Sequence, residues 1–134
     1  MVYSISDPEH AYYGIVEAMN YAEKFNIPVV VLTDKCIAET NISLPEYDAS
    51  KVTIERGFTA ASDINASSDR YALDNPIGSR WLPGSSNHVY FANGDEHSED
   101  GTLIEDAENC QKMADRRKER ISILEASLPK PEIL

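Results

Sequence analysis

In the first 34 residues, three segments with different hydrophobic patterns follow one another, and few folds are compatible with their order. A short β-prone run at residues 2–5 precedes a segment, residues 8–25, in which apolar side chains recur every three or four positions. An unbroken apolar run follows at residues 28–32. The recurrence predicts a helix with one buried face, and the unbroken run is typical of a strand covered on both faces. Strand, helix and apolar strand in this order predict a βαβ unit of parallel sheet and an α/β fold.

Local signals mark both ends of the first helix. Asp7 can accept a hydrogen bond from the first free N–H groups of the helix. Pro8 costs no hydrogen bond at the first helical position, because an N–H there would have no partner within the helix. Pro28 follows the last apolar position of the helix and separates it from the second strand. Two strands are too few for a stable sheet by themselves, so this unit needs further structure.

The middle of the chain lacks a regular pattern. A short helix is compatible with residues 34–40, but between residues 41 and 87 polar and turn-forming residues dominate, including those at 63–68. A span of this length usually packs on something. The large apolar candidates for such anchors are Phe58, Tyr71, Trp81 and Leu82. Residues 88–92 alternate enough to predict a short strand that leads into a turn bracketed by Gly94 and Gly101.

A second helix is predicted from Asp106 to about Ala126. Acidic residues gather at its start, where the helix dipole favours them, and the basic run 116–120 reads as a solvated face. A stripe of mostly apolar residues along this helix has nearly heptad spacing. Its members are Cys110, Met113, Ala114, Arg117, Ile121, Leu124 and Leu128.

Length, charge and cysteine content exclude several classes of protein. The chain has 134 residues, enough for one domain with a single core, and its net charge of −11 disfavours nucleic acid and anionic membranes as partners. Cys36 and Cys110 lack metal-ligand spacing, so neither a zinc site nor an iron–sulfur site is indicated. No apolar run is long enough to span a membrane, and no leader pattern opens the sequence. We therefore expect a cytoplasmic protein.

The acidic turn at residues 94–101 holds the candidate functional residues. Asp95 and Glu96 offer hard oxygen ligands beside the imidazole of His97, a mixture that can bind a divalent cation or act in acid–base chemistry. The spacing does not match a calcium loop, and no serine or cysteine is placed as a nucleophile for His97. Phosphate-binding glycine motifs, CxxC and HExxH are also missing from the sequence. A structural acidic turn without metal is therefore favoured, with a metal-dependent hydrolase as a lesser alternative.

A series of short motifs in a fixed order resembles the α subunit of 2-oxoacid:ferredoxin oxidoreductases, the 2-oxoglutarate type more than others. None of these motifs is specific alone, and their order carries the resemblance. They are Asp7-Pro8-Glu9, residues 17–20, residues 22–24, residues 28–35, Ala38-Glu39, residues 77–84, residues 94–97, Gly101, Glu105-Asp106, Glu108-Asn109 and Lys112-Met113.

The resemblance implies a place within a larger protein. Residues 1–40 would form the end of the pyrimidine-side domain of a thiamine-diphosphate-binding-type fold. Residues 41–134 would form a linker, the acidic loop and a helix leading to the next domain. The resemblance also implies that this chain alone binds no cofactor, since the family's cofactor motifs have no counterpart here. In the full complex, thiamine diphosphate, magnesium, iron–sulfur clusters and coenzyme A are implied.

Two interpretations of function follow. In the first, the chain is a fragment or split part of such an α subunit, inactive alone, whose complete complex oxidatively decarboxylates a 2-oxoacid to acyl-CoA. Its partners would be the β subunit or further copies of itself, and Asp95, Glu96, His97 and Arg80 would contact the active site or a subunit interface. In the second, the chain is a stand-alone acidic protein-interaction module with a closed core.

Overall fold

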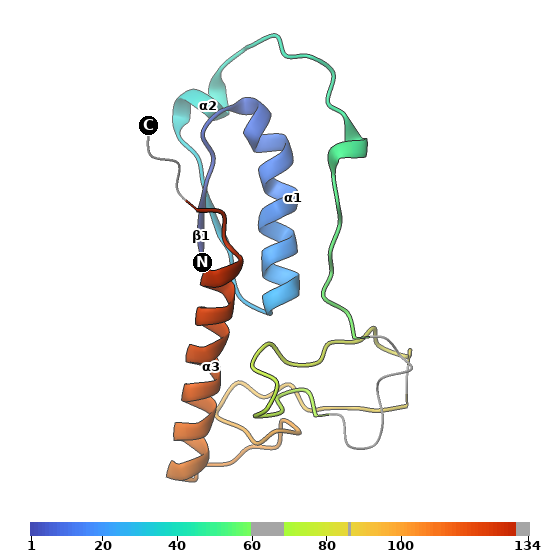
Figure 1. Ribbon diagram of the computed structural model, residues 1–134, viewed down its shortest axis with the longest axis vertical. Coiled ribbons are helices and arrows are strands. Elements are labelled where there is room, and N and C mark those ends of the chain that lie inside the picture. The colour runs from blue at the N-terminus through green and yellow to red at the C-terminus, as the bar shows by residue number, and fades with distance from the viewer. Residues whose placement is uncertain (60–68, 86, 131–134) are drawn as a thin grey trace. The chain divides into compact units, whose positions relative to one another are not determined.

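The computed structural model describes residues 1–59, 69–85 and 87–130, and it divides into two compact units, Met1–Gly57 and Phe58–Leu134. The turn residues predicted at 63–68 lie outside the described residues. Figure 1 shows the elements along the chain. They are β1 (Val2–Ser4), α1 (Pro8–Phe25), β2 (Val30–Leu32), α2 (Lys35–Glu39), the 3-10 turn η1 (Ala49–Lys51) and α3 (Ala107–Ser127). None of the helices in the described part of the chain is long and apolar enough to cross a membrane.

The predicted βαβ unit is confirmed, and with it the α/β fold class. Strands β1 and β2 pair in parallel, with Val2 opposite Val30 and Ser4 opposite Leu32. Helix α1 begins where the sequence predicts, because a side-chain oxygen of Asp7 accepts from the His10 N–H group at 2.7 Å. The helix ends at Asn26, whose left-handed conformation, with φ of 51°, stops its propagation.

The two faces of this small sheet differ. Tyr3 and Val31 point to the side of α1, where Tyr3 Oη lies 3.1 Å from His10 Nε2 and donates to Glu17 at 2.6 Å. Burial and the hydrogen bond to Glu17 raise the pKa of the Tyr3 hydroxyl. On the opposite face Val2, Val30 and Leu32 are 63%, 54% and 50% exposed. The expectation of cover on both faces is therefore wrong for the described chain, because no described element packs over these side chains.

The polar segment after α2 packs on α1. Tyr47 stacks on Tyr12 with ring centroids 4.2 Å apart, and the Asn20 side chain bonds the backbone at Thr53 and Glu55. Side-chain amides of this kind satisfy backbone groups that have no strand partner. Residues 47–55 thus follow α1 without regular hydrogen-bonded structure of their own, apart from η1.

The strand predicted at residues 88–92 does not form. These residues are described and carry no ladder, because Phe91 alone among residues 89–92 makes a backbone bond, from its N–H to the Asp100 carbonyl at 3.2 Å. Among the predicted anchors Trp81 is buried, whereas Phe58 and Leu82 are exposed. Trp81 packs edge-on against Tyr90, so an aromatic contact holds the irregular chain in place of a sheet.

Helix α3 agrees with its predicted range, but its buried side does not agree with the predicted stripe. Met113 and Leu124 are buried as predicted, whereas Arg117 and Ile121 face outward. Arg116, which the sequence placed on a solvated face, is only 5% exposed. The guanidinium of Arg116 finds carbonyl partners in a neighbouring loop, and these partners could not be read from helical periodicity.

Candidate functional site

The acidic turn is a closed loop built on backbone hydrogen bonds. The Ser98 N–H donates to the Thr102 carbonyl at 2.8 Å, and the Ile104 N–H donates to the Glu96 carbonyl at 3.2 Å. Residues 98–101 close a tight turn through a bond from the Gly101 N–H to the Ser98 carbonyl at 3.0 Å. Gly101 has a φ of 89°, a backbone conformation that residues with a Cβ rarely adopt.

Asp100 holds the inside of this turn. Its carboxylate accepts from the Ser98 hydroxyl and from both the N–H and the hydroxyl of Thr102. These hydrogen bonds, of which the one from Ser98 contributes most, lower the pKa of Asp100. The Asp100 carboxylate therefore stabilises the closed conformation of the loop.

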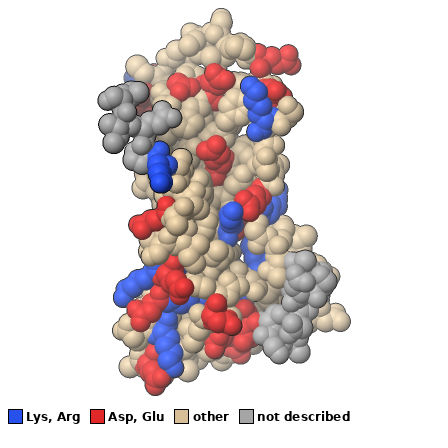
Figure 2. Space-filling model, in the orientation of Figure 1, with Lys and Arg blue, Asp and Glu red and all other residues tan. Residues whose placement is uncertain are grey.

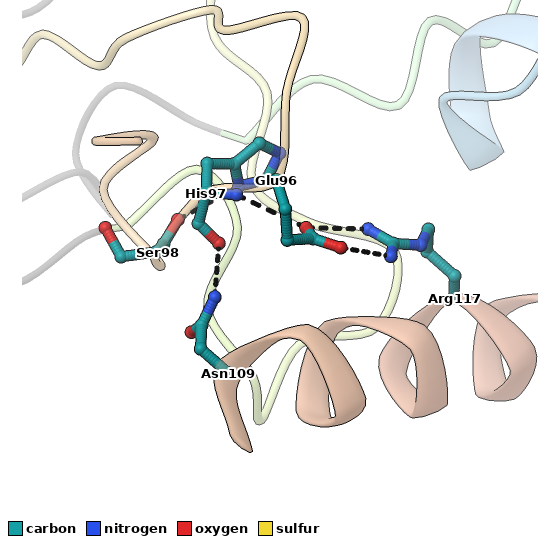
Figure 3. A network of polar contacts seen from close by, with 5 residues as sticks. All are labelled: Glu96, His97, Ser98, Asn109 and Arg117. Atoms are coloured by element: carbon teal, nitrogen blue, oxygen red, sulfur yellow. Dashed lines mark hydrogen bonds and ion pairs between the residues drawn. The ribbon is translucent and has the colours of Figure 1, made fainter. Parts of the chain in front are cut away.

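Glu96 links the loop to α3 by a two-pronged ion pair. Arg117 Nη2 lies 2.6 Å from Glu96 Oε2, and Arg117 Nη1 lies 3.1 Å from Glu96 Oε1 (Figure 3). Nearby, the Asn109 side chain donates to the His97 carbonyl at 2.9 Å. The hydrogen bonds from Arg117 hold the pKa of Glu96 below its ordinary value and keep it ionised at neutral pH. Two of the predicted site residues are thus positioned by one helix.

The imidazole of His97 is held by packing and by one backbone carbonyl. Its ring lies against Tyr71, with centroids 4.0 Å apart, and Nδ1 lies 3.1 Å from the Ser98 carbonyl oxygen. Since a carbonyl only accepts, Nδ1 donates and carries the proton in this arrangement. In the described part of the chain the imidazole makes no hydrogen bond to a hydroxyl or thiol that it could activate, because its contact with Tyr71 is between the rings.

Asp95 and Arg80 do not join the network of Glu96 and His97. The Asp95 backbone N–H donates to the Asn93 side chain, and its exposed carboxylate makes no hydrogen bond or ion pair with the described residues. Arg80 places its guanidinium 4.9 Å from the centre of the Phe58 ring. Within residues 1–59, 69–85 and 87–130, no three histidine, cysteine, aspartate or glutamate side chains form a group that could hold a metal ion. Glu96 and His97 therefore form a structural junction to which Asp95 is adjacent.

The sequence did not predict a second polar site, in which arginine side chains donate to backbone carbonyls of the loop at residues 70–79. Arg116 donates to the carbonyls of Ala72 and Asn75, and Arg120 donates to the carbonyl of Pro76 at 3.0 Å. Arg70 donates to the Ser79 carbonyl at 2.7 Å. The helical spacing could have indicated this site, because positions 116 and 120 lie on the same helix face as the apolar positions 113 and 124.

Burial and charge shape this arginine site. Burial, followed by repulsion from Arg120 and Arg70, lowers the pKa of Arg116 to about 10, so it stays a cation at neutral pH. Elsewhere on α3 charges of opposite sign lie next to one another, as Figure 2 shows. Examples are Lys112 with Glu108 and Lys118 with Asp115. Such exposed pairs contribute little to stability, whereas the buried Arg116 and the half-buried Arg70 and Arg120 hold carbonyl groups of a loop.

The ion pair of Glu96 gives a prediction that depends on pH. Its side chain is 23% exposed against 47% for Arg117, so we expect Glu96→Gln to cost about 0.5 to 1 kcal/mol at neutral pH. The pKa of folded Glu96 lies below the ordinary 4.5, so the full difference persists above that value and disappears as pH falls through the folded pKa. Urea denaturation of both proteins across this range measures it. Glu105→Gln, at an exposed side chain without described contacts, is the matched control, and an equal loss in both variants would contradict the assignment.

Comparison with known proteins gives one consistent family. None of the protein-family models compared with the sequence matches it. The sequence is 33% identical over 129 residues to the α subunit of 2-oxoacid:ferredoxin oxidoreductase 1 of Aeropyrum pernix, covering 96% of this chain and 20% of that protein. It is 29% identical over 132 residues to the corresponding Sulfurisphaera tokodaii protein, covering 96% of this chain and 21% of that one.

A solved structure agrees with these relatives. The 2-oxoglutarate:ferredoxin oxidoreductase from Magnetococcus marinus, with 2-oxoglutarate, coenzyme A and succinyl-CoA bound, matches 99% of this chain with a TM-score of 0.87 and 26% identity. The match covers 24% of that protein's chain. The chain thus spans about a fifth of the length of the relatives it matches in sequence. Over nearly its whole length, it belongs to the family of 2-oxoacid:ferredoxin oxidoreductase α subunits as the counterpart of one segment of them.

Proposed function

We propose that the chain acts as one segment of an α subunit in a 2-oxoacid:ferredoxin oxidoreductase, and that it is inactive alone. The complete complex would oxidatively decarboxylate a 2-oxoacid to acyl-CoA, with a substrate of the 2-oxoglutarate type. The match of 96% of this chain to only 20% of the Aeropyrum pernix protein carries the proposal. The substrate class rests on the Magnetococcus marinus enzyme, with its bound 2-oxoglutarate and succinyl-CoA.

Exposed apolar side chains support a role within a larger assembly. The face of the sheet formed by Val2, Val30 and Leu32 is at least half exposed, although parallel sheets are normally covered on both faces. On α1, Ile15 and Met19 are also exposed one helical turn apart. In this proposal residues 1–40 complete a thiamine-diphosphate-type domain, and residues 41–134 link it to the next domain.

The described residues do not fit an iron–sulfur cluster or a magnesium site. An iron–sulfur cluster usually takes four thiolates, and this chain has only the exposed Cys36 and the half-buried Cys110. The described carboxylates and histidines do not form a metal-binding group that could hold the magnesium of thiamine diphosphate. In this proposal thiamine diphosphate, magnesium, iron–sulfur clusters and coenzyme A are bound by other parts of a cytoplasmic complex that includes a β subunit. Asp95, with its exposed carboxylate, is the best placed of the candidate residues to contact such a partner.

Co-production tests this function. The chain is expressed alone and together with the remaining α-subunit segments and the β subunit of a related enzyme, and 2-oxoglutarate-dependent reduction of ferredoxin is measured. We expect no turnover from the chain alone and turnover from the combination. Turnover by the chain alone would refute the proposal. So would failure to associate with the other segments combined with a monomer that is stable at all concentrations in sedimentation, as a stand-alone interaction module would be.

A further inference from the structure

Residues 89–92 present large apolar side chains to solvent. Val89 is 83% exposed and Phe91 is 67% exposed, although both are large apolar residues. Tyr90, between them, is 39% exposed and lies edge-on to Tyr71 and Trp81. The ring of Tyr90 therefore packs on the chain while its two neighbours extend into solvent, which is how successive side chains are directed in a strand.

The backbone of the segment is also available for pairing. The Phe91 N–H donates to the Asp100 carbonyl on the side of the acidic turn, while Val89, Tyr90 and Ala92 make no backbone hydrogen bond with any described residue. An exposed edge of this kind is a template on which another extended chain can add. The aromatic contacts of Tyr90 fix the segment beforehand, which reduces the entropy lost on binding.

Hollows lie at both ends of the segment. One has a volume of about 210 Å³ and is lined by Trp81, Pro83, Gly84 and residues 88–90. The other has a volume of about 380 Å³ and is lined by residues 91–94 and 101–103, which include the exposed Leu103. Apolar side chains at alternate positions of an added strand would fit such hollows, since alternate side chains point to the same face.

The charge around the segment selects the partner. Residues 82–111 contain no lysine or arginine and have seven acidic residues, which are Asp95, Glu96, Glu99, Asp100, Glu105, Asp106 and Glu108. Arg117 neutralises Glu96, but Asp95 and Asp100 directly flank residues that line the larger hollow. Charge complementarity therefore favours a basic partner, and a second copy of a chain with net charge −11 is disfavoured.

We propose that residues 89–92 form a docking edge to which an extended segment of another polypeptide adds as a strand. The partner segment has apolar side chains at alternate positions and lysine or arginine between or beside them. The inference stands on the contacts of this chain and is independent of the enzyme activity proposed above.

A synthetic peptide in which lysine alternates with valine tests the docking edge on the complete 134-residue chain. We expect saturable binding that is at least about tenfold weaker for a peptide with glutamate in place of lysine, a difference of about 1.4 kcal/mol. We also expect slower hydrogen exchange at the amides of Tyr90 and Ala92 in the complex. A version with proline in place of the central valine should not bind, because proline cannot donate to a ladder.

Variants of the chain locate the site. Phe91→Ser should weaken binding at least about tenfold, whereas Ile121→Ser, which removes an exposed apolar side chain of α3, should leave it unchanged. Circular dichroism establishes that both variants are folded. The inference is overturned by absence of binding, by equal binding of the proline peptide, or by equal effects of the two variants. Concentration-dependent dimers that Phe91→Ser abolishes would also overturn it, because the occupant would then be a second copy.

Discussion

Gly101→Ala is expected to destabilise the second unit by about 3 kcal/mol or more. Gly101 adopts a φ of 89°, where a residue with a Cβ is strained, and a Cβ added there would collide with the carbonyl group of Phe91. That carbonyl belongs to the backbone, so it cannot move aside as a flexible side chain would. Strain and overpacking each contribute about 1 to 3 kcal/mol in such cases.

Gly94 provides the matched control, because it brackets the same acidic turn from the other end. A Cβ added at Gly94 meets nothing within 4 Å and its φ is not in the left-handed region, so Gly94→Ala should change stability by less than about 0.5 kcal/mol. Urea denaturation followed by the fluorescence of Trp81, the single tryptophan, measures both variants. Equal stability of the two variants would show that the loop does not depend on the close approach at Gly101.

Replacing Arg116 by methionine should cost about 2 to 4 kcal/mol. The Arg116 side chain donates from Nε to the Ala72 carbonyl at 2.8 Å and from Nη2 to the Asn75 carbonyl at 2.9 Å. Methionine keeps the apolar stem but removes two hydrogen bonds from a charged donor, each worth about 1.5 to 3 kcal/mol. The two carbonyls keep only their backbone partners, the N–H groups of Asn75 and Gly78. Removing a buried cation offsets part of this loss, because burial of Arg116 is itself unfavourable.

Lys118→Met is the control for this second prediction. Lys118 lies on the same helix, its side chain is 73% exposed, and its ion pair with Asp115 is at the surface. We expect its stability to differ from that of the wild-type chain by less than about 0.5 kcal/mol. If Arg116→Met proved as stable as Lys118→Met, the loop at residues 72–76 would be held by its own turns and not by the guanidinium. Thermal and urea denaturation, each followed by Trp81 fluorescence, distinguish these results.

The regular elements were predictable because their signals are local. The cap formed by Asp7, the proline at position 8 and the periodicity of residues 8–25 gave α1 with the observed bounds. The apolar run before Asp34 likewise gave β2 and the parallel pairing. In contrast, residues 88–92 have the alternation of a strand and form none, because a strand also needs a neighbour and the described chain supplies none.

The candidate site was predicted only in part. The turn at residues 94–101 was recognisable from its glycines and acidic residues, and the family was recognisable from the order of short motifs. The partners of the side chains were not, since Glu96 meets Arg117 across 21 positions of sequence and Arg116 meets Ala72 across 44. Helical periodicity assigned Arg117 to the buried stripe and Arg116 to solvent. In the structure Arg116 is buried and Arg117 is exposed.

By itself, the sequence determined the α/β class, the bounds of the long helices and the family, because caps, periodicity and motif order act within short stretches of chain. Only the tertiary structure decided which face of the sheet is exposed, which arginine is buried, and that Val89, Tyr90 and Ala92 make no backbone hydrogen bond with a described residue. These properties depend on contacts between residues distant in sequence. Their free energies come from desolvation and hydrogen-bond partners that no local pattern encodes.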